Sequence, residues 1–248
     1  MGHEPVIRYL PESRMAVLMI HGILGSPCHF EFLLPQIPED WSVYNILLDG
    51  HGGTAGEFGR TSMKKWKKQV SDQLSLLRSR HEKILIVTHS MGGLFAIQEA
   101  AEDPRKIGGL FLLAVPMKPW VSFRGALSSA KAALGLVDEK DKVTTAMRED
   151  SSVTLTRNLF AYIPWIPKFV ALLWEAHKTC AAVQRLAVPC RAVQSAKDEM
   201  VSMRSCKALR KNPAVAITVM EHSGHFGYEG SELEKVRGEF CRMLEELA

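Results

Sequence analysis

The sequence lacks a cysteine pair with metal-binding or redox spacing. It contains five cysteines among 248 residues, an odd number, and none of them forms a Cys-x-x-Cys motif. This usage argues against a disulfide framework and against a structural zinc site, and it is typical of proteins in reducing compartments. We therefore expect a cytoplasmic location. The five positions are Cys28, Cys180, Cys190, Cys206 and Cys241.

A strong charge of one sign and a long apolar run are also absent. The net charge is +4, which is too small for the basic face that nucleic-acid binding needs. Residues 1–5 do not begin a secretory leader, because no basic region followed by an apolar run is present. The most apolar long stretch, residues 159–174, contains two prolines and a lysine. It is too short to span a bilayer as a helix, so no integral membrane segment is expected.

The sequence does contain apolar strands that alternate with amphipathic helices. Its composition, 46% hydrophobic and 23% charged, is that of an ordinary globular protein. Continuous apolar runs favour strands that are buried on both faces, as in a parallel sheet. These runs cover residues 14–20, 43–48, 84–88, 110–115, 190–194 and 215–220. The alternation predicts an α/β fold, with a mostly parallel central sheet flanked by helices.

Three helices are marked by their spacing or their first residues. Apolar residues three or four apart predict a helix over residues 63–77, with its lysines at positions 64, 65, 67 and 68 facing away from the core. Ser26 and Pro27 predict a helix over residues 28–34. Residues 231–234 have the pattern of a capping box, which predicts the start of the last helix.

Residues 117–187 interrupt this alternation, since they contain no convincing strand. We expect a helical cap inserted over the sheet, with residues 1–116 and 188–248 forming the core domain. The apolar side chains of the cap either pack its own core and its contact with the sheet or line an acyl-chain pocket. Flanking prolines suggest short broken helices that could move as a lid. The apolar residues are Leu159, Phe160, Tyr162, Ile163, Trp165, Ile166, Phe169, Leu172, Leu173 and Trp174.

The strongest chemical signal is at Ser90. The strand over residues 84–88 leads directly into this serine, and Gly92 and Gly93 then open a helix. A sharp strand-to-helix turn exposes a serine hydroxyl at the end of the sheet and needs small neighbours, as in the Gly-x-Ser-x-Gly nucleophile elbow. Thr88 stands at the first position of that pattern in place of glycine. The bland alternative is that Ser90 is an ordinary helix cap.

Three further segments carry polar groups after strands. The glycine-flanked residues 21–26 could aim backbone N–H groups at an oxyanion, and the candidate donors are the N–H groups of Ile23 and Met91. His21 itself is more consistent with a brace for this loop. Asp198 follows the strand over residues 190–194, and His225 follows the strand over residues 215–220. The chain order is therefore serine, acid, histidine, as in the nucleophile-elbow architecture.

Two of these positions have a competing neighbour. Glu199 could carry the acid role by sequence alone, and His222 competes with His225. The nine histidines form no cluster with metal-ligand spacing, so no metal is expected.

With these motifs in order, the sequence resembles the α/β-hydrolase superfamily, and within it the cytosolic carboxylesterases and monoacylglycerol-lipase-like serine hydrolases with a helical cap. The resemblance extends from His21 to His225, and residues 49–54 resemble the family's Pro-Gly-His-Gly loop with Asp49-Gly50 at its start. It places the acid at the first loop position after its strand, which favours Asp198.

The resemblance implies a catalytic triad of Ser90, Asp198 and His225, with no cofactor. The expected substrate is a small-molecule carboxylic ester with a short to medium apolar acyl group. The nucleophile is serine rather than aspartate, which excludes dehalogenase and epoxide-hydrolase relatives. A carbon–carbon bond hydrolase and a non-catalytic small-ligand receptor of the same fold remain as alternatives.

Overall fold

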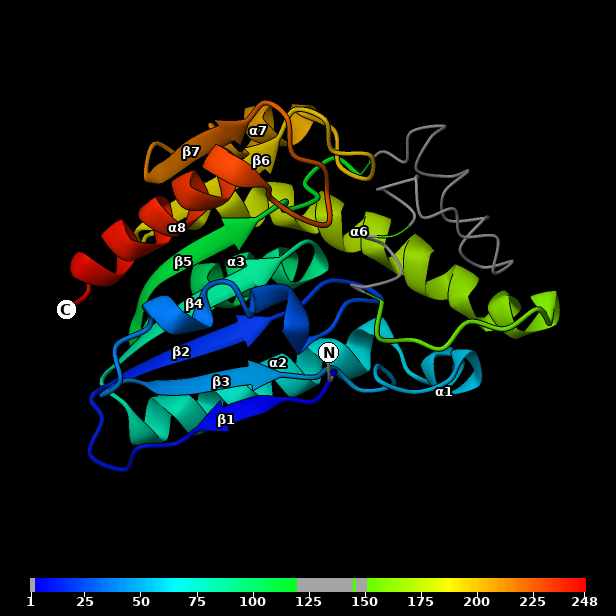
Figure 1. The fold of residues 1–248 in the computed structure, drawn as a ribbon, viewed down its shortest axis with the longest axis horizontal. Coiled ribbons are helices and arrows are strands. Elements are labelled where there is room, and N and C mark those ends of the chain that lie inside the picture. The colour runs from blue at the N-terminus through cyan, green and yellow to red at the C-terminus, as the bar shows by residue number, and fades with distance from the viewer. Residues whose placement is uncertain (1–2, 120–144, 146–150) are drawn as a thin grey trace.

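A seven-stranded sheet forms the centre of the molecule in the computed structural model, which describes residues 3–119, 145 and 151–248. The strand order is β1-β3-β2-β4-β5-β6-β7 (Figure 1). Every neighbouring pair is parallel except β1 with β3. The strands are β1 (Val6–Arg8), β2 (Met15–Ile20), β3 (Ser42–Ile46), β4 (Lys83–His89), β5 (Ile107–Leu113), β6 (Cys190–Ser195) and β7 (Val215–Met220).

The mostly parallel sheet predicted from the apolar runs is confirmed, with β2 to β7 at the six expected places. The seventh strand, β1, was not predicted. It has only three residues, and Val6 and Ile7 are exposed, so it carries no core pattern. It forms by pairing antiparallel with the free edge of β3, where Ile7 lies opposite Tyr44.

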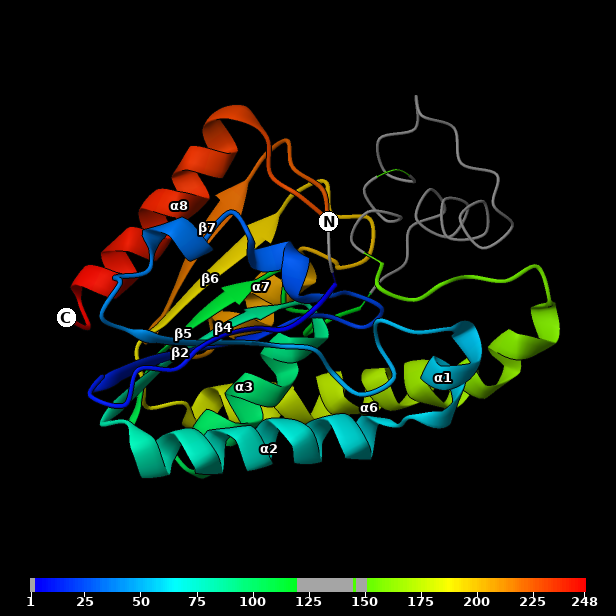
Figure 2. The same ribbon diagram turned by 60° about the horizontal axis from the view of Figure 1, so that its bottom comes forward.

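Helices cover both faces of the sheet (Figure 2). On one face lie α2 (Met63–Arg80), α3 (Met91–Glu102) and α6 (Ile166–Ala182). On the other lie α8 (Gly230–Glu245) and two short 3-10 turns, η1 (Pro27–Phe30) and η2 (Leu34–Gln36). Two separate buried apolar clusters fill these two layers. The other helical elements among the described residues are α1 (Ala55–Arg60), η3 (Leu159–Trp165), η4 (Val183–Arg185) and α7 (Arg204–Leu209).

Helix α2 buries the apolar stripe that its spacing predicts, through Met63, Trp66, Val70, Leu74 and Leu77. One of its four lysines differs from the prediction. Lys67 turns toward α6 and forms an ion pair with Glu175, with 2.9 Å between Nζ and Oε2. The prediction that this lysine faces away from the core is therefore wrong, because the buried carboxylate of Glu175 lies within its reach.

The predicted starts of two helices are also wrong in detail. The helix expected over residues 28–34 is divided into η1 and η2. The capping box expected at residues 231–234 does not form, since α8 begins at Gly230 and has no side-chain cap. The Glu232 carboxylate instead accepts hydrogen bonds from the backbone N–H groups of residues 221–223. Because α8 begins at Gly230, Ser231 already lies inside the helix and cannot act as its N-cap.

The structure describes the second half of the predicted cap (residues 117–187), from residue 151 onward. Its prolines do not break α6 into short pieces: Pro164 lies within η3, and Pro167 lies in the first turn of α6, where its missing N–H has no helical partner to lose. One helix of 17 residues therefore runs beside α2 and α3 (Figure 2). The division into core and cap stays a prediction, because residues 120–144 and 146–150 lie outside the described residues.

The apolar side chains of this segment are mostly exposed. Among the ten predicted to pack or to line a pocket, only Trp165 is buried, while Tyr162 and Leu172 are partly buried. Packing of a cap core is therefore the wrong interpretation for the other seven, which face solvent: Leu159, Phe160, Ile163, Ile166, Phe169, Leu173 and Trp174.

Within the described part of the chain, one helical stretch is long and apolar enough to cross a membrane by these two criteria alone. It runs from Leu159 to Arg185 and contains an 18-residue window with a mean hydropathy of 1.2. The sequence expectation of no such stretch rested on its prolines and on the shorter span of residues 159–174. Its inner face holds an ion-paired Glu175 against α2, so in this fold the stretch is part of the folded domain.

Candidate active site

Ser90 lies at the carboxyl end of β4, in the turn that leads into α3. Its backbone has φ 50° and ψ −120°, in a region that L-residues rarely adopt and that costs on the order of 1–3 kcal/mol. The Ser90 N–H donates to the carbonyl of Leu113 on β5 at 2.8 Å, which holds the turn against the neighbouring strand. The side chain makes no helix-capping hydrogen bond, so the ordinary-cap interpretation does not describe this serine.

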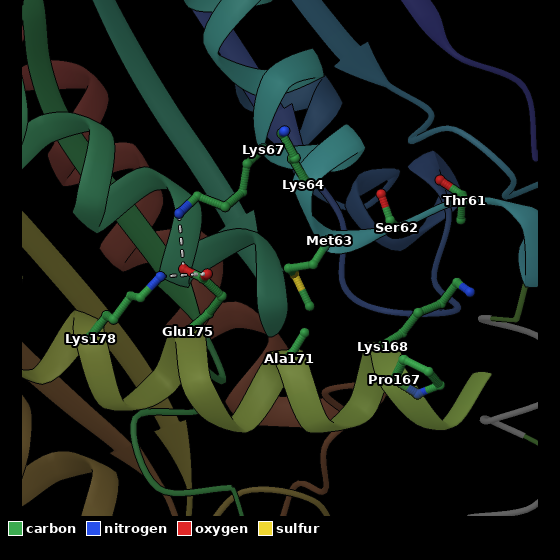
Figure 3. Close-up of a pocket in the computed structure, with 10 residues that line it drawn as sticks. All are labelled: Thr61, Ser62, Met63, Lys64, Lys67, Pro167, Lys168, Ala171, Glu175 and Lys178. Carbon is green, nitrogen blue, oxygen red and sulfur yellow. Dashed lines mark hydrogen bonds and ion pairs between the residues drawn. The ribbon is translucent and has the colours of Figure 1, made fainter. Parts of the chain in front are cut away.

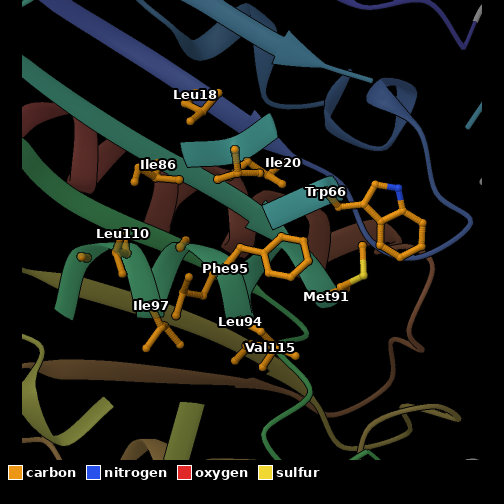
Figure 4. Packing of buried hydrophobic residues seen from close by; sticks show 14 of the residues in the cluster. Leu18, Ile20, Trp66, Ile86, Met91, Leu94, Phe95, Ile97, Leu110 and Val115 are labelled. Atoms are coloured by element: carbon orange, nitrogen blue, oxygen red, sulfur yellow. The ribbon is translucent and has the colours of Figure 1, made fainter. Parts of the chain in front are cut away.

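The two glycines after Ser90 allow α3 to pack directly on the strand ends. A Cβ at Gly92 would lie 2.2 Å from the carbonyl oxygen of Ile20, and one at Gly93 would lie 2.7 Å from Val115. Behind them, apolar residues of α3 pack on the sheet, Phe95 and Leu94 among them (Figure 4). Thr88, which replaces the first glycine of the usual pattern, is fully buried.

The loop over residues 21–25 lies directly against Ser90. A Cβ at Gly22 would come within 2.9 Å of the Ser90 Cβ and 3.5 Å of its Oγ. Glycine is therefore the residue that lets this backbone approach the serine. Ile23, whose N–H is the predicted oxyanion donor, follows Gly22 directly in this loop.

Two buried histidines brace this loop. His21 Nδ1 lies 2.8 Å from the carbonyl oxygen of Gly22, and His21 Nε2 accepts from the Leu48 N–H at 3.0 Å. His51 Nε2 accepts from the Leu24 N–H at 3.2 Å. Burial and the neighbouring His21 lower the pKa of His51 well below its usual value, so the His51 ring is neutral and can accept this bond. Both histidines therefore hold this loop through hydrogen bonds to backbone groups.

Ser152 contacts the same loop from the predicted cap. Leu24 has a left-handed φ of 64°, and its carbonyl accepts from the Ser152 N–H at 2.9 Å. The Ser152 hydroxyl donates to the carbonyl of Gly25 at 2.7 Å. Leu24 is thus held from both sides, by His51 at its N–H and by Ser152 at its C=O. No motif in the sequence predicts this contact, which joins residues 128 positions apart.

Asp198 and His225 are brought together at the ends of β6 and β7. The distance between Asp198 Oδ2 and His225 Nδ1 is 2.8 Å, and both side chains are almost fully buried. The other carboxylate oxygen of Asp198 accepts from the N–H groups of Met200 and Val201 at 2.8 and 2.7 Å. These two hydrogen bonds therefore hold the carboxylate so that its Oδ2 faces the imidazole.

The two competing residues take different positions. Glu199 Oε2 accepts from the backbone N–H of His225 at 3.1 Å, so this carboxylate holds the loop while Asp198 contacts the ring. His222 is exposed, and its backbone N–H is bound to Glu232. The geometry pairs Asp198 with His225 and leaves Glu199 and His222 outside that pair.

Two further contacts fix the histidine loop. Burial alone would raise the pKa of the Glu232 carboxyl, but hydrogen bonds from the Ser223 hydroxyl and the N–H groups of residues 221–223 lower it to about 2. His89, next to Ser90, has its Nε2 3.0 Å from the carbonyl of His225. Burial, with His29 and His225 nearby, lowers the pKa of His89 well below its usual value. A neutral His89 can donate this bond and join the serine turn to the histidine loop.

Two cavities in the described part of the chain do not contain the serine. One of about 550 Å³ lies between the start of α2 and α6, where Lys67 and Lys178 point toward Glu175 (Figure 3). Another of about 430 Å³ lies over residues 49–53. Neither is lined by Ser90, Asp198 or His225, so the predicted acyl pocket stays a prediction. Among the described residues, no cluster of three or more histidine, cysteine or acidic side chains could hold a metal ion.

Comparison with known proteins agrees with this architecture. The profile of the alpha/beta hydrolase family matches residues 17–237. The chain belongs to the alpha/beta hydrolase family. This alpha/beta hydrolase is 25% identical to the uncharacterised protein Rv2715 of Mycobacterium tuberculosis over 87% of the chain and 71% of that protein.

Two lipolytic proteins are also similar to this alpha/beta hydrolase. A thermostable monoacylglycerol lipase of Bacillus sp. (strain H-257) is 28% identical over 42% of the chain and 41% of that enzyme. A solved structure from work on the metagenome-derived lipolytic enzymes LipS and LipT matches with a TM-score of 0.74 and 18% identity, over 99% of the chain and 98% of that structure. At this identity the structural match shows the fold.

Proposed function

We propose that the protein is a serine hydrolase that cleaves carboxylic esters with short to medium acyl chains. The observation that carries the proposal is the strained turn at Ser90, which its neighbour His89 joins to the loop of the buried Asp198–His225 pair. A binding protein has no need of a serine held at this backbone conformation beside an oriented histidine. The lipolytic relatives support an ester substrate with an apolar acyl group.

In the proposed mechanism Ser90 attacks the acyl carbonyl, and His225 takes the serine proton and returns it to the leaving alcohol. Asp198 holds the imidazole through Nδ1 and stabilises its cationic form. The N–H groups of Ile23 and Met91 would bind the oxyanion, and the N-terminus of α3 favours negative charge at the same place. Water then releases the acyl group from Ser90, and no cofactor takes part.

The first test is the chain-length profile of kcat/KM for p-nitrophenyl esters with acyl groups of two to sixteen carbons. We expect an optimum at short to medium length, because each methylene buried in an apolar pocket contributes about 0.8 kcal/mol until the pocket is filled. A flat profile would contradict the acyl pocket. Absence of turnover together with fluorophosphonate labelling of Ser90 would favour carbon–carbon bond hydrolysis, and absence of both would favour the receptor.

A second test concerns the loop that holds Ile23. Replacing Ser152 by alanine removes the hydroxyl that donates to the buried Gly25 carbonyl. We expect kcat to fall by roughly 10- to 100-fold with KM changed little, because a small displacement of an oxyanion donor acts mainly on the transition state.

Kinetics of Ser152→Ala beside Ser151→Ala and Ser152→Thr would check this expectation. Ser151 donates only a long 3.4 Å bond to Val153, so its variant is the matched control. Threonine keeps the hydroxyl and should restore most of the activity. Equal losses in Ser151→Ala and Ser152→Ala would show that the loop does not depend on this hydrogen bond.

A further inference from the structure

The outer face of η3 and α6 is apolar and exposed, although it lies on a helix of a folded domain. Along α6 the exposed residues recur at helical spacing: Ile166, Phe169, Val170, Leu173 and Trp174. η3 continues the face with Leu159, Phe160 and Ile163. We call these eight side chains the outer face. Phe160 is 79% exposed and Trp174 is 60% exposed, far beyond what scattered surface residues show.

The inner side of the same helix carries the polar groups. Lys168 is buried, and its Nζ donates to the carbonyls of Gly59 and Pro164 at 2.9 and 2.8 Å. Glu175 is buried in its ion pair with Lys67. Thr179 accepts from Gln98 on α3 at 2.7 Å. These contacts fix the rotation of α6 about its axis, so the outer face cannot turn inward without breaking them.

The inner side of α6 is thus already packed and hydrogen-bonded, so the apolar outer side indicates contact with a further apolar phase. Within the segment that carries the outer face, most charged side chains are positive. Residues 151–185 contain Arg157, Lys168, Lys178 and Arg185, and their one acidic residue is the ion-paired Glu175. Arg157 lies two residues before the first residue of η3 and is exposed. Lys178 pairs with Glu175 at 3.3 Å but stays half exposed, and its Nζ lies 5.7 Å from the Trp174 ring centroid.

This composition fits a lipid surface better than a second copy of the chain. A tryptophan beside a lysine suits the boundary between acyl chains and headgroups, where the ring is buried and the ammonium reaches water. A two-fold dimer through this face would bring two surfaces of the same positive charge together. Lipid phosphates supply the opposite charge.

We propose that the outer face docks on the surface of a bilayer that contains anionic phospholipids. The helix lies in the plane of the interface, with its apolar side chains among the outer acyl chains and Arg157 and Lys178 at the headgroups. This inference goes beyond the proposed hydrolysis and does not depend on it, because binding is measured without turnover.

The test is sedimentation of the full chain with vesicles made of ether-linked lipids, which contain no ester to cleave. Vesicles of phosphatidylcholine alone are compared with vesicles containing 30% phosphatidylglycerol, roughly the charge density at which such attraction becomes strong. We expect binding to the anionic vesicles that falls when salt is raised. The fluorescence of Trp174 should shift to shorter wavelength, and this shift should be lost in Trp174→Phe while binding remains.

The double variant Leu173→Ser/Trp174→Ser is expected to lower the partition coefficient at least tenfold, because two large apolar side chains no longer enter the bilayer. Arg157→Gln should lower it roughly fivefold on anionic vesicles only. Ile7→Ser is the matched control, since Ile7 is 53% exposed on β1 and lies outside the outer face. It should bind like the wild type.

Three results would overturn the proposal. The first is equal binding of the wild type and the double variant. The second is a failure to bind vesicles together with a concentration-dependent dimer that the double variant loses, which would assign the face to a second copy. The third is a wild type that does not bind vesicles together with a double variant that melts at a lower temperature, which would show that the face is covered within the chain.

Discussion

Replacing Ser90 by alanine is expected to lower kcat/KM for ester hydrolysis by roughly 10⁴-fold or more while the protein stays folded. Alanine differs only by the hydroxyl, and it accepts the positive φ of 50° at about the same cost as serine. The Asp198–His225 pair and the oxyanion loop would remain, so the residual rate would report what these groups supply without a nucleophile. The measurement is kcat/KM on the optimal p-nitrophenyl ester, with the melting temperature as a check of folding.

The control for this variant is Ser79→Ala. Ser79 lies near the end of α2, before the amino end of β4, whereas Ser90 lies after the carboxyl end of that strand. Its variant should keep full activity and full labelling by a fluorophosphonate, and Ser90→Ala should lose both. Labelling that persists in Ser90→Ala would place the nucleophile elsewhere.

Replacing Asp198 by asparagine is expected to lower kcat by roughly 10³- to 10⁴-fold. An amide at this position can turn its NH₂ group toward His225 Nδ1, which would stabilise the tautomer that cannot accept the serine proton at Nε2. The hydrogen bonds from Met200 and Val201 already occupy the other oxygen of Asp198, so the side chain has no second arrangement that keeps an acceptor facing the ring.

Glu199→Gln is the matched partner of this variant. Glutamine keeps an oxygen that can accept from the His225 N–H, so we expect a change of about threefold or less. The pair of variants separates a carboxylate that acts on the imidazole from one that holds the loop. A larger loss in Glu199→Gln than in Asp198→Asn would reverse the two roles.

Much of the fold was predictable because its signals are local. The strands β2 and β4 are continuous apolar runs, and such runs specify a sheet that is covered on both faces. The turn at Ser90 was also visible, since Gly92 and Gly93 follow a strand directly and each is needed where α3 meets its neighbours. The chain order of serine, acid and histidine also predicted that Asp198 would pair with His225. The two side chains are in contact in the structure.

The rest depended on contacts that no local pattern encodes. Ser152 reaches Leu24 and Gly25 across more than a hundred residues, and its own neighbourhood in the sequence contains no motif. Ser231 and Glu234 matched a local capping pattern, but α8 begins one residue earlier, at Gly230. The Glu232 carboxylate between them accepts hydrogen bonds from three N–H groups of the loop before the helix, which the local pattern does not encode. The exposed face of α6 was misread for a similar reason. An apolar helix stripe indicates contact with something apolar, and it does not say whether that is the protein's own core.

Strand β1 has a consequence for the behaviour of the protein in concentrated solution. It covers one edge of β3, a strand whose five residues are all buried, and Arg8 ties it down by donating to the carbonyls of Trp41 and Pro38. Without these three residues, β3 would offer an open row of backbone donors and acceptors along an apolar strand. Such a row is a template on which strands of other molecules can add. The N-terminal strand thus contributes to keeping the molecules apart, a role that its short and exposed sequence does not indicate.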